Sequence, residues 1–379
     1  MLFRSTNEYR LFESMWDRIA KQAQFDDGVR LSELMYSTLE EEIAYPWKLN
    51  KCHEFGIDSE SLQRLIDVGW LERDGRRVRV WHTRLLNWLV AECLAEEFRS
   101  SGDEIIPLIN EVFNPNKSDR NVLNGEYLEY VPMDLLWLLC DESHPRRKDA
   151  HLVLESIEQI QYPGMTFHNE LFNSLIPTLG PRVMAVITDY YRHNNLSPES
   201  LSVTTFAKTL NVIGLDSPLE VSEFAVQLLA DPNIGIRVVA PKVLKELPTE
   251  KALNELWSLL KVIRREEGLV PNEIRSSYTH HKRETESAIS KCARLSPRWI
   301  ETCIKGKNED ADLILFLADI LSTIDGEEAQ EVWHNSKESL FRISSEGSPS
   351  LALCIDRFED GNRNPLLESW IKSNDTRLI

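Results

Sequence analysis

The sequence predicts a mainly α-helical protein in two parts, a small module built around one β-hairpin and a longer array of paired helices. Three observations carry this prediction. A hairpin signal lies between two amphipathic helices within residues 58–98. From Met133 onward, apolar residues recur at helical spacing. Prolines separated by about 36 residues mark the starts of successive helices in this second part.

The order of elements in the first part is that of a winged-helix module. A helix capped by Ser59 is expected to end at Gly69, because glycine readily takes the left-handed conformation that closes a helix. Two short strands then flank residues 73–76, in which an Asp-Gly pair favours a type I′ turn. A long helix restarts at Thr83. Helix, two-stranded wing and helix together define the module.

The flanks of this module predict a three-part domain organisation. In chain order we expect a helix over 7–24, a break at 26–28, a helix over 31–45, a loop over 47–56 and a short helix over 103–113. Asn114–Gly125 is rich in Asn, Ser, Asp and Gly, and it is the best linker in the chain. The expected parts are a helical lead-in plus winged helix (1–113), a linker (114–130) and a helical repeat domain (131–379).

The second part reads as stacked pairs of helices. The expected pairs are Met133–Cys140 with Pro145–Gln161, Met165–Leu179 with Pro181–Asn194, Pro198–Ile213 with Pro218–Leu229, and Ile234–Leu247 with Thr249–Glu266. Pro145, Pro181 and Pro218 lie 36 and 37 residues apart, and Pro297 follows after about two further periods. Proline is tolerated at the first helical position because that N–H has no partner within the helix. Two helices per repeat at this period are typical of an α-solenoid.

One repeat is specific enough to resemble a known family. In residues 224–247 an apolar helix ends at Asp231-Pro232, and the following helix carries Arg237, Ala240 and Leu244 at helical spacing. This unit resembles a HEAT repeat. The predicted fold class is therefore all-α dominated, a winged-helix module followed by a HEAT-like α-solenoid.

The winged-helix module itself resembles that of STAND NTPases, the NACHT and related signalling ATPases of bacterial defence and innate immunity. The resemblance rests on residues 62–73 and 80–92 and extends over roughly residues 7–98. In that family a His at the end of the wing, often within Met-His-Asp, contacts the β-phosphate of bound ADP. The matching positions here are Trp81, His82 and Thr83, of which only His82 agrees. The resemblance thus implies a nucleotide-sensing role for His82; capping of the following helix is the alternative.

The chain lacks the residues that would let it bind or hydrolyse ATP alone. It contains no GxxxxGK[ST] phosphate loop and no strand ending in paired acids. No Ser/His/Asp or Cys/His order stands out, which by itself decides nothing. Because the phosphate loop and any cluster of metal ligands are both missing, we predict a non-enzymatic protein without a cofactor. If the resemblance holds, this is the carboxy-terminal half of a STAND protein or a separate partner of a P-loop ATPase domain, with a role in signalling or antiviral defence.

Charge argues against nucleic acid as the partner. The formal net charge is −18, and residues 57–99 hold 7 basic and 8 acidic residues. Two other classes nevertheless stay open. One is a winged-helix DNA-binding protein that grips DNA through Arg73, Arg76 and Arg77 on the wing. The other is an enzyme on a HEAT-like scaffold, similar to the alkylpurine glycosylases, although these need a basic concave groove.

The cellular setting is predicted from cysteine usage and hydropathy. The six cysteines are far apart and form no CxxC pair, a spacing that favours reduced, mostly buried thiols over disulfides or a zinc site. No apolar run approaches the roughly 20 residues of a membrane span, and the first residues do not read as a signal peptide. We therefore expect a cytoplasmic protein without membrane contact or bound metal.

The repeat array predicts a surface for a protein partner. Its inner face should come from the second helices of the pairs, whose exposed positions mix charges of both signs with Tyr190, Tyr191 and Arg192. Aromatic and Arg side chains dominate the binding energy of protein interfaces, so Tyr191 and Arg192 are the expected contacts. The alternative is that Tyr190 and Tyr191 pack between repeats.

Overall fold

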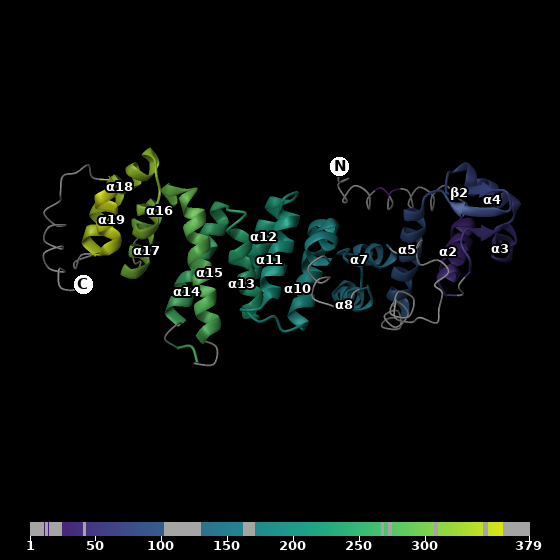
Figure 1. Cartoon of the computed structure of the whole chain (residues 1–379), viewed down its shortest axis with the longest axis horizontal. Coiled ribbons are helices and arrows are strands. Elements are labelled where there is room, and N and C mark those ends of the chain that lie inside the picture. The colour runs from purple at the N-terminus through teal and green to yellow at the C-terminus, as the bar shows by residue number, and fades with distance from the viewer. Residues whose placement is uncertain are drawn as a thin grey trace. The chain divides into compact units, whose positions relative to one another are not determined.

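The structure is a computed structural model of the whole chain and describes residues 25–40, 43–101, 130–161, 171–266, 269–271, 275–306, 310–343 and 348–358, with Leu11 and Ser14. The described residues form sixteen α-helices and one three-stranded sheet, so the chain is predominantly α-helical (Figure 1). Contacts divide it into two compact units, one of residues 1–196 with 204–221 and the other of residues 197–203 with 222–379.

The first unit begins with a helical module that contains the sheet. Its elements are α2 (Phe25–Glu40), β1 (Trp47–Lys48), α3 (Leu49–Glu54), α4 (Ser59–Asp67), β2 (Leu71–Asp74), β3 (Arg77–Val80) and α5 (Thr83–Ser101). The strand order is β1-β3-β2, and both pairings are antiparallel. Helices α2 and α5 pack against each other, and the largest core side chains of the module are Trp47, Trp70 and Trp88.

Several local predictions for this module need correction. The Asp26-Asp27-Gly28 break lies inside the first turn of α2, where acidic side chains favour the helix N-terminus. Asp58, rather than Ser59, caps α4, since its carboxylate accepts from the backbone N–H groups of Glu60 and Ser61. The predicted loop 47–56 contains β1 and α3. Gly69 ends α4 as predicted, with φ of 82°.

The hairpin turn is shifted by one residue from its predicted position. The register pairs Asp74 with Arg77, which leaves Gly75 and Arg76 as the two turn residues. Gly75 has φ of 59°, whereas Arg76 is not among the residues with positive φ. A glycine with positive φ at the first turn position alone is the signature of a type II′ turn, and a type I′ turn would require positive φ at both positions.

The rest of the first unit is helical but irregular in one segment. Its elements are α7 (Val131–Leu139), the 3₁₀ turn η2 (Arg147–Asp149), α8 (Ala150–Gln161), the π turn η3 (Leu171–Leu175), the 3₁₀ segment η4 (Ile176–Val183), α10 (Met184–His193), α11 (Leu201–Gly214) and α12 (Pro218–Leu228), of which the last two contribute residues to both units. Over residues 171–179 the predicted helix 165–179 is a π turn followed by 3₁₀ turns and contains no regular α-helix. Gly180, at φ of 67°, interrupts the helical backbone between the two predicted helices 165–179 and 181–194.

The second unit contains helices that pack in two series. They are α13 (Ile234–Leu244), α14 (Glu250–Glu266), α15 (Arg275–Arg294), α16 (Pro297–Ile304), α17 (Ala311–Ser322), α18 (Glu327–Ile343) and α19 (Pro349–Phe358). Helix α13 packs on α15, α15 on α17, and α17 on α19. In the other series α16 packs on α18, and Trp257 of α14 meets Trp299 of α16 edge to face with ring centroids 5.6 Å apart. Successive helices along the chain, such as α14 and α15, also pack together (Figure 1).

The proline period is partly reflected in these helices. Pro218 and Pro297 are the first residues of α12 and α16, as predicted. Pro145 precedes η2 and Pro181 lies within η4, so α8 and α10 begin three to five residues later than predicted, at Ala150 and Met184. Proline marks the approach to a helix at these two positions without being its first residue.

The helix packing buries four of the six cysteine side chains. All six cysteines are free thiols, and burial raises the pKa of Cys52 and Cys292 to about 11 and that of Cys140 and Cys354 to about 12. These four thiols are therefore protonated at neutral pH. No helix within the described residues combines the length and apolar character needed to cross a bilayer.

The predicted helices 7–24 and 103–113 and the linker 114–130 lie outside the described residues, apart from Leu11, Ser14 and Tyr130. The domain boundary that rests on this linker stays a prediction.

Candidate functional site

The candidate site is the corner where the hairpin ends and α5 begins. Strand β3 alternates, with Val78 and Val80 buried and Arg77 and Arg79 exposed. Continuing this alternation past Val80 turns Trp81 outward, and its indole is 56% exposed. The Trp81 backbone N–H donates to the Trp70 carbonyl at 2.9 Å, which fixes the corner to the strand at the base of the hairpin.

His82 is exposed beside Trp81 and caps α5. Its Nδ1 accepts a hydrogen bond from the backbone N–H of Arg84 at 3.2 Å. An accepting Nδ1 places the proton of a neutral imidazole on Nε2. The ring centroids of Trp81 and His82 are 6.1 Å apart. The corner thus presents a large aromatic surface next to an imidazole N–H donor. This geometry agrees with the capping alternative for His82, while its nucleotide-sensing role stays a prediction.

Arg84 anchors this corner from behind. Its guanidinium forms a two-point ion pair with Asp134 of α7, with Nη1–Oδ2 at 2.7 Å and Nη2–Oδ1 at 2.8 Å. It also lies over the ring of Tyr130, 4.5 Å from the centroid. Asn87 adds two hydrogen bonds, donating to the Thr83 carbonyl at 2.9 Å and accepting from the Tyr130 N–H at 3.0 Å. These contacts join α5 to α7 although the two are far apart in sequence.

The face of α4 is poorly suited to a nucleic-acid backbone. Arg64 is the only basic residue of this helix, and Asp27 on α2 binds it at 2.7 Å through Nε and at 3.0 Å through Nη2. Glu60 forms a third ion-pair contact with the Arg64 guanidinium, with Nη1–Oε1 at 3.0 Å. The hydrogen bonds from Arg64 lower the pKa of the Asp27 carboxyl, which is almost fully buried. The exposed positions that remain include Glu60 and Asp67, so the face is acidic.

The side chains of two of the four wing arginines have hydrogen-bond partners, and those of the other two are exposed with none among the described residues. Arg73 donates through Nε to the Gly75 carbonyl at 3.0 Å, which closes the turn. Arg79 binds Glu72 across the hairpin at 2.8 Å, and this contact raises the Arg79 pKa. Arg76 and Arg77 are exposed at the tip. Of the residues predicted as nucleic-acid contacts, Arg76 and Arg77 are thus available, and Arg73 is engaged with the backbone.

Tyr191 does not lie on an exposed face, which corrects the basis for its predicted partner contact. The side chain is 2% exposed, and its ring stacks on Phe206 with centroids 4.8 Å apart. Burial raises the Tyr191 pKa. Tyr190 is also buried, and its hydroxyl donates to Glu158. Both tyrosines therefore belong to the core between helices, which is the alternative that the sequence left open. Arg192 is exposed and pairs with Asp189, and its partner-binding role stays a prediction.

Sequence reasoning missed two features of this site. The exposure of Trp81 was available from the alternation along β3. The Arg84–Asp134 pair had no local signal, because its members are separated by fifty residues and by the segment 102–129. Among the described residues, no three His, Cys, Asp or Glu side chains are placed together as metal ligands would be.

Comparison with protein families, with curated proteins and with solved structures yields no significant match to this chain. The function is therefore argued from the geometry of the chain itself.

Proposed function

We propose that this protein is a non-catalytic regulatory or sensor module of a STAND-type signalling or defence ATPase, and that it binds protein partners. In this proposal the first unit contains a winged helix, and the helices that follow form a HEAT-like α-solenoid. The P-loop ATPase is supplied by another domain or subunit, and the setting is the cytoplasm. A further protein partner binds on the helical repeats.

The order of elements supports the winged-helix interpretation. Helix, short strand, two helices and a two-stranded hairpin run from α2 to β3, and the first strand completes a three-stranded antiparallel sheet. The two series of packed helices in the second unit support the repeat interpretation, since α13, α15, α17 and α19 pack in succession, as do α16 and α18, and Trp257 of α14 meets Trp299 of α16.

The single observation that carries the proposal is the exposed Trp81 on a rigid corner. Trp81 exposes 56% of its surface beside the N–H donor of His82, and Trp is among the residues enriched at binding hot spots. The Arg84–Asp134 ion pair and Asn87 hold the corner in place before any partner arrives. Pre-organisation of this kind reduces the entropic cost of association.

Duplex binding receives less support from the same unit. The one cation on α4 is neutralised by Asp27 and Glu60, and two free arginines at the wing tip provide few phosphate contacts. A protein partner that covers the Trp81 corner is the better fit.

Affinity capture of the tagged full chain from its native cells, with and without nuclease, tests the proposal. We expect a protein containing a P-loop to be recovered in both conditions, and the Trp81→Ala variant to recover much less of it. Recovery that depends on intact nucleic acid, or recovery by Trp81→Ala equal to that of the unaltered chain, would contradict the proposal.

A further inference from the structure

The interface between α13 and α15 is a series of matched polar contacts. The pairs are Lys242 with Glu284 at 2.9 Å, Lys245 with Ser287 at 3.0 Å, and Glu246 with Lys291 at 2.6 Å. Each of these side chains meets a complementary group on the opposite helix. The two helices therefore run side by side with their polar side chains in register.

The N-terminal end of the same interface departs from this pattern. Arg237, in the first turns of α13, lies near His281 of α15, which is 1% exposed. Neither Nε of Arg237 nor Nε2 of His281 has a hydrogen-bond partner among the described residues, although both atoms are buried. A buried polar atom left without a partner destabilises the folded state, so such atoms are uncommon. Two buried nitrogen atoms at this end thus lack the partner groups found elsewhere along the interface, while the Arg237 guanidinium also faces the Tyr278 hydroxyl.

The carboxylates near this position are already engaged. Glu266 of α14 accepts from the Tyr278 hydroxyl at 2.8 Å, a bond that raises the Tyr278 pKa. Glu284 is taken by Lys242 at 2.9 Å, with His280 a further 3.9 Å contact. These two carboxylates are therefore not free to serve Arg237 and His281.

We propose that Arg237 and His281 bind an oxyanion, either a free anion or the carboxylate or phosphate group of a larger ligand. The guanidinium donates through Nε–H, and the imidazole donates through Nε2–H as a neutral ring, so that one oxygen or two neighbouring oxygens meet both donors. Arg237 lies in the first turn of α13, so the positive end of that helix dipole adds to the attraction for an anion.

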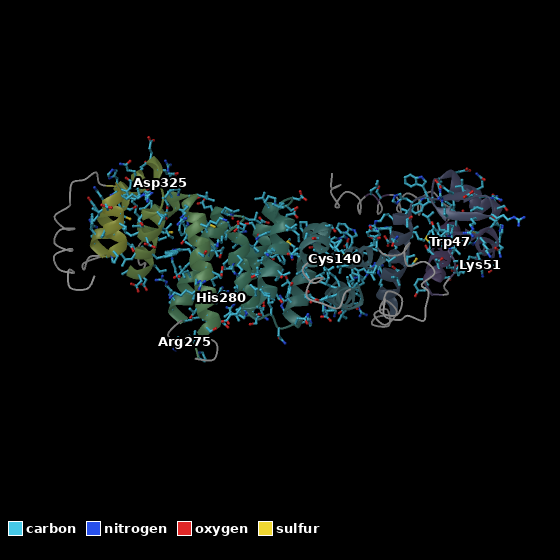
Figure 2. All side chains as sticks on the ribbon, in the orientation of Figure 1. Trp47, Lys51, Cys140, Arg275, His280 and Asp325 are labelled. Carbon is cyan, nitrogen blue, oxygen red and sulfur yellow. The ribbon has the colours of Figure 1, made fainter. Side chains whose placement is uncertain are left out.

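The polar side chains around His281 continue toward the surface. Figure 2 shows His280 and Arg275 toward the same end of α15, and Arg275 and Ser276 are exposed there. Arg237, Tyr278 and His280 are half-buried, so the polar cluster extends from the surface inward to His281.

The protonation behaviour of His281 fits this geometry. Burial, together with the nearby Arg237 and His280, lowers the pKa of His281 to about 4, so the ring is neutral at pH 7. A bound oxyanion would offset the two cationic neighbours and raise this pKa. The charged and titratable groups around the ring are Arg237 and Lys242 of α13, Glu266 of α14, and Tyr278, His280 and Glu284 of α15.

The test is a titration of the purified full chain with sodium phosphate and, separately, sodium acetate at matched ionic strength. The melting temperature should rise with the anion that binds, because a ligand of the folded state stabilises it. His281, followed by its imidazole NMR signals, should show a higher pKa in the presence of that anion. A response to phosphate alone assigns a phosphate-type ligand, and a response to acetate alone assigns a carboxylate.

Two variants complete the test. Arg237→Gln should weaken the binding of the anion by about tenfold or more, since a charge-assisted hydrogen bond is lost. Lys291→Gln is the matched control, because Lys291 is a cation of α15 that pairs with Glu246 further along the helix, and it should leave the anion response unchanged. If the folded wild-type chain shows neither a melting-temperature shift nor a change in the His281 pKa with either anion, the proposal is wrong. Arg237 and His281 then bind no oxyanion.

Discussion

Arg84 and Asp134 form a two-point ion pair at 2.7 and 2.8 Å that joins the first turn of α5 to α7. Asp134 is fully buried and the Arg84 side chain is 13% exposed. This pair lies directly behind the exposed Trp81–His82 corner, so it links the stability of the first unit to the geometry of the proposed binding site.

Replacing Arg84 by Ala should destabilise the first unit by about 3–5 kcal/mol, because it leaves the buried Asp134 carboxylate without a partner. Urea unfolding followed by tryptophan fluorescence measures this loss. The double variant Arg84→Met with Asp134→Leu should recover most of the stability, because it removes both charges together.

The control for this prediction is Arg79→Gln on the hairpin. Arg79 and Glu72 form an exposed pair at 2.8 Å, and exposed pairs contribute little. Equal losses from Arg84→Ala and Arg79→Gln would show that the Arg84–Asp134 pair does not hold α5 to α7.

The Asp27–Arg64 pair predicts a contribution to stability that disappears in acid. The pKa of Asp27 is lowered in the folded chain by its hydrogen bonds from Arg64. The resulting stabilisation is fully present above the ordinary Asp pKa of about 3.9 and is lost as the pH falls toward the lower folded value. The stability difference between wild type and Asp27→Asn should therefore shrink below about pH 4. A difference that stays constant from pH 7 to pH 3 would contradict this prediction.

His281 also predicts a loss of stability toward acid, but in a higher pH range than Asp27. Its folded pKa is about 4, below the ordinary value of about 6.5, so between these values the unfolded chain binds the extra proton. Stability should fall as the pH decreases through this window, by up to about 1.4 kcal/mol per pH unit. In a buffer without phosphate or carboxylate, His281→Gln should remove this slope. An identical slope in both proteins would place the titrating group elsewhere.

Local sequence signals predicted the elements of the hairpin module better than its details. Gly69 and Thr83 were correct as the end of α4 and the start of α5, because each depends on backbone conformation and apolar spacing nearby. The turn was displaced by one residue, since the pairing of Leu71 with Val80 sets the register and buries both side chains. Strand β1 was missed because two residues become a strand only by pairing with β3.

The candidate site could be predicted only in part. Trp81 and His82 follow from the position of the hairpin, whereas Asp134 depends on tertiary packing between distant segments. Tyr191 was predicted on an exposed face because helical spacing alone does not reveal how many neighbours cover a helix. In the structure α10 is covered on more than one side, by Phe172 and Phe206 among others.

The burial of Tyr191 changes how the predicted repeat surface should be tested. Tyr191→Ala should destabilise the chain by about 3–5 kcal/mol, as expected for removing a large aromatic side chain from a core. A loss of binding in that variant would therefore reflect unfolding. Arg192→Ala, at an exposed position, should leave the unfolding midpoint nearly unchanged and is the useful probe of a partner on this face. A marked destabilisation by Arg192→Ala, or none by Tyr191→Ala, would contradict the observed packing.

The most direct test of the proposed function is the dissociation constant between the purified chain and the P-loop protein that it captures, measured for two matched variants. Trp81→Ala removes the exposed aromatic corner, and Arg76→Ala removes a free cation from the wing tip. A protein partner on the corner predicts binding about thirtyfold weaker for Trp81→Ala, as for a Trp hot spot, and unchanged for Arg76→Ala. Equal dissociation constants for Trp81→Ala and the wild type, or weakening only by Arg76→Ala, would contradict the account.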